Sequence, residues 1–104
     1  MSDHHPDYRE GLEQQVEHEL ERPPMYKVLL HNDDYTTMEF VVEIIRQVFH
    51  KNAAEATRIM LLVHKTGSGV CGVFTEDVAE TKVEIVHHLA KKSGFPLRCT
   101  MEEA

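Results

Sequence analysis

Residues 25–45, MYKVLLHNDDYTTMEFVVEII, change their hydrophobic period halfway along and so decide the fold. The residues Tyr26, Val28 and Leu30 alternate with Lys27, Leu29 and His31, which predicts a β-strand with one fully apolar face. Further along, the apolar residues recur at helical spacing instead, and we expect a helix over about residues 37–50. The polar segment between the two patterns is therefore a turn that joins a strand to a helix.

This turn places an amide and two carboxylates, those of Asn32, Asp33 and Asp34, directly before the helix. Such residues make good turns and suit the positive end of a helix dipole, so a purely structural role would also explain them. Thr36 and Glu39 have the spacing of a capping box, which would fix the start of the helix. The acidic turn is then held in a defined position, where it is a candidate recognition site for a cation.

A second helix is predicted from about Ala53 to His64, with Asn52 as its N-cap. Residues 65–67 give this helix a basic end that is terminated by glycine. A short strand is expected over residues 69–74.

A third helix is predicted to start after Thr75 and to end before Gly94. We expect four of its apolar residues to face the core: Val78, Ile85, Val86 and Leu89. Alternating residues from Leu97 to Met101 predict a last strand. The order is then βααβαβ, and because three short strands cannot bury two faces, we predict an α/β fold (an α+β sandwich) whose small sheet is covered on one face by three helices.

The length and net charge of the chain limit the number of domains and the kinds of partner that it can have. The 104 residues suffice for one small domain, which we place at residues 25–104. Residues 1–24 hold seven acidic against two basic residues and end in two prolines, so we expect a mobile acidic extension. The net charge of −7 argues against nucleic acid as a partner, and no apolar run approaches the length needed to span a bilayer. We therefore expect a cytoplasmic protein.

The cysteines and histidines do not form a recognisable metal site. Cys71 and Cys99 are far apart in sequence and are expected to be buried, reduced thiols. A small metal-dependent hydrolase is an alternative, but His87 and His88 are adjacent on a helix and point in different directions, with only Glu84 spaced to share a face with His88. We expect no metal, no cofactor and no catalytic activity.

Several sequence blocks along residues 25–102 together closely resemble the ClpS family. The blocks are Asn32–Thr36 with Met38–Val42, Arg58–Met60 with Val63 and His64, Val70–Phe74, Val78–Val83 and Pro96–Thr100. ClpS proteins are adaptors that hand substrates to the ClpA unfoldase of the bacterial ClpAP protease, and the resemblance implies an antiparallel sheet. This chain departs from the pattern at Thr37, where family members often carry proline.

The resemblance implies that the protein binds proteins or peptides with a free, large hydrophobic N-terminal residue, Leu, Phe, Tyr or Trp, and delivers them to ClpA. It assigns the α-amino group to Asn32, Asp33, Asp34 and His64. It assigns the hydrophobic pocket to Thr36, Met38, Val41, Met60, Val63 and Leu97. By the same analogy Asp77 and Lys82 contact the N-terminal domain of ClpA, and we expect a monomer in solution.

Two other interpretations stay open from the residues alone. His64 at a helix end would otherwise be expected to cap carbonyl groups of its own helix. The element order also matches the C-terminal domain of the ribosomal stalk protein, and fold alone does not decide function. Only the acidic turn, with Met38 and His64, distinguishes the adaptor from such a module.

Overall fold

The computed structural model describes residues 22–104, which form three strands and three helices. In chain order they are β1 (Met25–His31), α2 (Met38–Phe49), α3 (Ala53–Thr66), β2 (Ser68–Thr75), α4 (Glu76–Ser93) and β3 (Arg98–Glu103). The predicted βααβαβ order is confirmed, and each boundary lies within about two residues of its predicted position. The prediction of a mobile extension concerns residues 1–24, of which all but the last three lie outside the described residues.

The sheet has the order β2-β1-β3, and both strand pairs are antiparallel. The first strand is therefore the central one, and the register places His31 opposite Ser68 on one side and opposite Arg98 on the other. The β1–β2 register shifts between Val28 and Leu29, so β2 carries one extra residue there. The end of β1, where the acidic turn begins, is thus held by two neighbouring strands.

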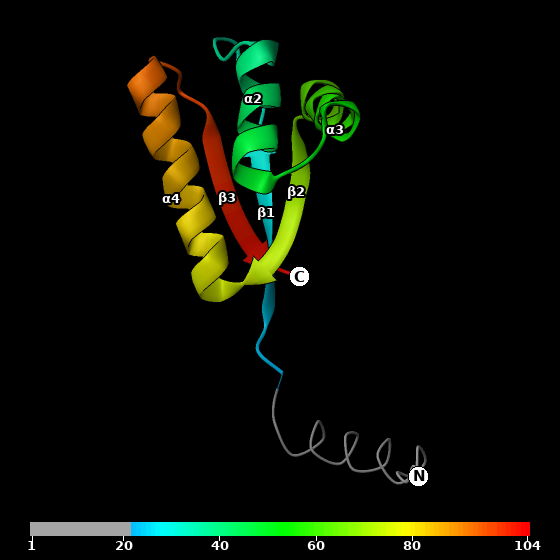
Figure 1. The fold of residues 1–104 in the computed structure, drawn as a ribbon, viewed down its shortest axis with the longest axis vertical. Helices are drawn as coiled ribbons and strands as arrows, with labels where there is room; N and C mark the ends of the chain where they lie inside the picture. Colours follow the sequence, from blue (N-terminus) through cyan, green and yellow to red (C-terminus); the bar gives the residue numbers. More distant parts are fainter. Residues whose placement is uncertain (1–21) are drawn as a thin grey trace, which may run out of the picture.

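All three helices lie on one face of this sheet, as predicted (Figure 1). In Figure 1, α4 runs beside β3, α2 lies over the central strand, and α3 lies next to β2. The core is formed by the inward residues of the strands and helices. Its largest fully buried side chains are Leu30, Ile44, Ile45, Ile59, Val28, Val86, Cys71 and Cys99.

Cys71 and Cys99 are both buried and unpaired, in agreement with the prediction of reduced thiols. They lie on the two strands that flank β1. Burial raises the pKa of each thiol to about 12, so neither is a thiolate at neutral pH.

The prediction for α4 was wrong for two of its core residues. Val78 and Ile85 are 42% and 41% exposed, and the buried residues of this helix are Ala79, Val86 and Ala90. Alanine has no side chain beyond Cβ, so a helix that turns its alanines inward can approach the sheet closely. The larger residues then lie on the neighbouring, outward side.

Candidate functional site

The acidic turn is held together by Asp33. Its Oδ1 accepts hydrogen bonds from the backbone N–H groups of Tyr35 (2.8 Å) and Thr36 (2.7 Å), and its Oδ2 accepts one from the Thr36 hydroxyl (2.7 Å). Three donors in a short turn fix both carboxylate oxygens in place. A carboxylate can accept about four hydrogen bonds, so Asp33 keeps some capacity for a ligand.

The predicted capping box of Thr36 and Glu39 was wrong by one residue. The N-cap of α2 is Thr37, whose hydroxyl accepts from the N–H of Phe40 at 3.1 Å. The Thr36 hydroxyl donates to Asp33 instead, so it is not used to cap the helix. Proline has no side-chain oxygen to accept such a bond, so the threonine that departs from the family pattern has a capping role of its own here.

The far end of α3 is brought against the turn by a backbone hydrogen bond. The Asn32 N–H donates to the carbonyl of Gly67 at 2.9 Å. Gly67 ends α3 in the left-handed conformation, with φ 97°. This closure places His64, in the last turn of α3, beside the acidic turn although the two are distant in sequence.

His64 does not cap its own helix. The Thr66 hydroxyl, not the imidazole, donates to the carbonyl of Leu62 at 2.8 Å. Within residues 22–104, no hydrogen bond is recorded for the side chains of His64, Asn32 or Asp34, and all three are exposed. Their polar atoms are therefore free to meet a ligand.

These groups surround a cavity of about 240 Å³, here called the first-residue cavity. It is lined by Asn32, Asp33, Asp34, Thr36, Met38, Val41, Met60, Val63 and His64. Every residue predicted to contact the N-terminal residue of a substrate, except Leu97, thus lines one cavity. The volume is smaller than the range of about 300–1,000 Å³ that is usual for drug-sized ligands, which suits a single amino-acid residue.

The walls of the first-residue cavity divide by polarity. Val41, Met60 and Val63 are buried and give one apolar wall, whereas the acidic turn and His64 lie at the exposed mouth. Leu97 is only 3% exposed and belongs to the core, and it is not among the lining residues. A contact between Leu97 and a ligand stays a prediction.

Asp33 is charged at neutral pH in this setting. Burial by itself would raise the pKa of Asp33, but hydrogen bonds from the Thr36 hydroxyl and from the N–H groups of Thr36 and Tyr35 outweigh it and lower the pKa. The mouth of the cavity therefore presents a fixed negative charge that can hold an ammonium group.

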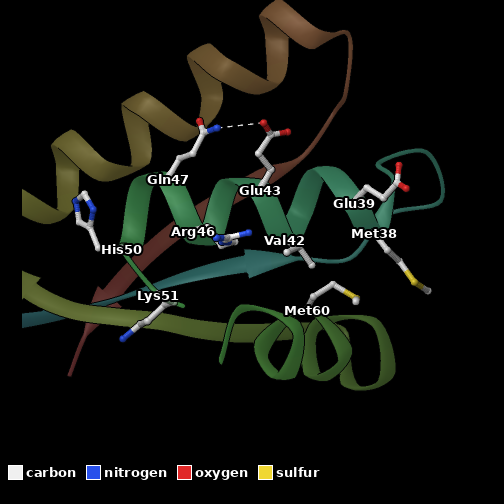
Figure 2. A pocket seen from close by; sticks show the side chains of 9 residues that line it. All are labelled: Met38, Glu39, Val42, Glu43, Arg46, Gln47, His50, Lys51 and Met60. Atoms are coloured by element: carbon white, nitrogen blue, oxygen red, sulfur yellow. Dashed lines mark hydrogen bonds between the residues drawn. The ribbon is translucent and has the colours of Figure 1, made fainter. Parts of the chain in front are cut away.

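A larger cavity of about 920 Å³ adjoins the first-residue cavity and shares Met38 and Met60 with it. We call it the α2 groove. Figure 2 shows that its side chains come from the length of α2 and the segment that follows it, with Met60 reaching in from α3. This groove was not predicted from the sequence; Val42, one of the residues that line it, is only half-buried.

The predicted partner residues Asp77 and Lys82 line a third cavity, of about 320 Å³, on α4. It also contains the exposed Val78 and Ile85. The Lys82 ammonium donates to the carbonyl of Val48 at 2.6 Å and lies 5.6 Å from the centre of the Phe74 ring. Lys82 is thus held in a fixed position in this cavity, which we call the α4 hollow.

The histidines considered for a metal site have other surroundings. His87 accepts a hydrogen bond at Nε2 from the buried backbone N–H of Cys99, at 3.0 Å, and so ties α4 to β3. Among residues 22–104, no three His, Cys, Asp or Glu side chains are grouped so that they could hold a metal ion. No helix in this part of the chain has the length and apolarity to cross a membrane.

Fold and site together define a small α/β domain with a cavity that is apolar inside and acidic at its mouth. Residues 21–100 match the family model of the ATP-dependent Clp protease adaptor protein ClpS. The chain belongs to this family of Clp protease adaptors.

Individual relatives agree with the family model. The Clp protease adapter ClpS of Nitratidesulfovibrio vulgaris strain Miyazaki F is 58% identical over 98 residues, which are 94% of this chain and 98% of the relative. That of Desulfatibacillum aliphaticivorans is 66% identical over 82 residues, 79% of each chain. Among solved structures, Agrobacterium tumefaciens ClpS2 bound to L-phenylalaninamide matches with a TM-score of 0.77 and 43% identity, covering 80% of this chain and all of that one.

Proposed function

We propose that this protein binds polypeptides with a free N-terminal Leu, Phe, Tyr or Trp and delivers them to the ClpA unfoldase of the ClpAP protease. One observation carries the proposal: carboxylate, amide and imidazole groups meet at the mouth of an apolar cavity sized for one residue. The ligand of the related ClpS2 structure, L-phenylalaninamide, has the two features that such a cavity recognises, an α-ammonium and a large apolar side chain.

The chemistry of a chain end explains the arrangement. Only an N-terminal residue offers an ammonium with three donors together with a side chain that no residue precedes. In this proposal Asn32, Asp33, Asp34 and His64 receive the amino group. The side chain enters between Val41, Met60 and Val63, and this burial contributes about 1.5–3 kcal/mol for Leu or Phe.

Titration with peptides that differ only at residue one tests this proposal. A fluorescent peptide that starts with Phe is expected to bind, and its N-acetylated form is expected to lose most of its affinity because the ammonium is gone. A peptide that starts with Ile should also bind poorly, since its β-branch is stiff and meets the wall near Cβ. Undiminished binding of the acetylated peptide would falsify the role of the acidic mouth.

Delivery requires a second surface, and we assign it to the α4 hollow around Asp77 and Lys82. Exposed Val78 and Ile85 give this hollow an apolar rim, and Thr75 and the Val78 N–H hold the Asp77 carboxylate in place with bonds of 3.0 Å. Ile85→Glu should abolish ClpA-dependent degradation of a Phe-starting substrate and leave peptide affinity unchanged. Glu84→Lys, a charge change on the same helix outside this hollow, is the control.

The N-terminal segment completes the proposal. In this proposal the unfoldase engages residues 1–20 while the folded domain holds its cargo. Deletion of residues 1–20 should therefore leave peptide affinity intact and abolish delivery by ClpA. Normal degradation with the truncated form would count against this step.

A further inference from the structure

The α2 groove is not needed to hold a single N-terminal residue, yet it opens directly from the cavity that would do so. The two cavities share Met38 and Met60. Met38 is 46% exposed and stands at the boundary, whereas Met60 is 8% exposed and lies in the floor of both. The α2 groove is therefore the surface that a chain attached to a residue in the first-residue cavity meets beyond Met38.

The direction of exit follows from the position of the amino group. If the ammonium is held by the turn and the first side chain points at the buried wall, the carboxyl side must leave away from the turn. The α2 groove begins on that side, and in Figure 2 Val42 and Arg46 follow Met38 along α2. These residues are spaced i, i+4 and i+8, so they share one face of the helix.

The groove changes its charge along its length. Glu39 lies near its start, and Arg46, His50 and Lys51 are at its far end (Figure 2). Glu43, in the middle, accepts a hydrogen bond from Gln47 at 3.1 Å. No ion pair joins Arg46 or Lys51 to any residue in the described part of the chain, so both cations are available.

We propose that the α2 groove receives the substrate residues that follow the N-terminal one, and that Arg46 and Lys51 favour acidic side chains at about the fifth and sixth positions. The inference rests on the proposed function of the neighbouring cavity. Eight helical residues at about 1.5 Å each separate Met38 from Arg46 by about 12 Å. An extended chain covers this distance in about four residues, at roughly 3.3–3.6 Å each, so the fifth residue reaches Arg46.

Binding of three probes to full-length protein tests the inference. The probes are phenylalaninamide, a hexapeptide Phe-Ser-Gly-Ser-Glu-Glu, and the same peptide with Lys at the last two positions. Wild-type protein is expected to bind the Glu peptide about three- to tenfold more tightly than the Lys peptide at low salt. The preference should shrink at high salt, because exposed charges are screened.

Charge reversal at the far end of the groove should remove this preference. Arg46→Glu and, separately, Lys51→Glu are expected to abolish or reverse it, and Lys92→Glu, the same change at an exposed position on α4, should keep it. Binding of phenylalaninamide should be equal in all four proteins, which also shows that the variants are folded.

The outcomes separate the two proposals. If wild-type protein binds phenylalaninamide but binds the Glu and Lys peptides equally, the inference about the groove is overturned and the first-residue cavity keeps its role. The inference is also overturned if Lys92→Glu changes the preference as much as Arg46→Glu does. If phenylalaninamide does not bind at all, the proposed function itself fails.

Discussion

Asp33→Asn should separate the charge of the acidic turn from its shape. Asparagine keeps an oxygen that can accept from the N–H groups of Tyr35 and Thr36, and its amide can donate to the Thr36 hydroxyl, which can act as acceptor. The pattern of the three bonds that the aspartate makes, of 2.7–2.8 Å, is therefore preserved. What disappears is the negative charge at the mouth of the cavity.

The expected loss of affinity can be worked from this geometry. A hydrogen bond to a charged group contributes about 1.5–3 kcal/mol, and each 1.4 kcal/mol is a factor of ten, so a Phe-starting peptide should bind about 10- to 150-fold more weakly. Stability should fall much less, by about 1 kcal/mol, because neutral bonds replace charge-assisted ones. For a domain of this size that corresponds to a Tm about 4–8 °C lower.

Fluorescence anisotropy with free and N-acetylated Phe peptides, on wild type and variant, gives the four corners of a double-mutant cycle. The free peptide should lose affinity in the variant, and the acetylated peptide should bind both proteins equally weakly. Asp34→Asn is the control for stability alone, because Asp34 is also assigned to the amino group: it removes the same charge from a side chain that makes no hydrogen bond within residues 22–104, so its Tm should not change. The proposed role of the Asp33 charge is refuted if Asp33→Asn binds the free peptide within twofold of wild type, or if both peptides lose affinity by the same factor.

Three further predictions concern single groups. Met38→Ala should admit Ile- and Val-starting peptides more readily, because Met38 stands at the rim of the first-residue cavity, and unchanged selectivity in a peptide titration would exclude it as the selectivity residue. Cys71 and Cys99 should resist iodoacetamide at pH 8 until urea unfolds the chain, because burial raises the pKa of each to about 12; rapid labelling of native protein would contradict this. Burial, together with the charge of nearby Arg98, lowers the pKa of His31, so as pH falls below about 6.5 the unfolded chain takes up a proton that the folded one does not. The free energy of unfolding should therefore decrease in that range by urea titration, and a His31→Gln variant should show a flatter dependence.

The residues of the first-residue cavity were predicted from the sequence mainly because they lie in blocks that resemble a known family. Their residue types alone would not have sufficed. Asn32 and Asp34 also suit an ordinary turn, and His64 also suits an ordinary helix end. The structure adds that none of these three side chains makes a hydrogen bond to another of the described residues. Their polar atoms are therefore available to a ligand, as a binding role requires.

The N-cap of α2 and the buried side of α4 were predicted wrongly, because each depends on which of several neighbouring residues makes a given contact. Thr36 and Thr37 are both suitable N-cap residues. Thr37 caps α2 because the Thr36 hydroxyl donates a hydrogen bond to the Asp33 carboxylate instead. On α4, the larger apolar residues Val78 and Ile85 were expected inside, but close packing on the sheet favours the stripe that contains alanines.

By itself, the sequence determined the order of strands and helices, the one-sided sheet and the ends of most helices, because these follow from periodicity and capping within a few residues. Only the tertiary structure decided that the turn after β1 meets the end of α3 through the bond from Asn32 to Gly67, and that a charged groove continues from that meeting point along α2. The physical reason is that a cavity is formed by surfaces distant in sequence. Its shape depends on how closely whole elements pack, which no local pattern of residues records.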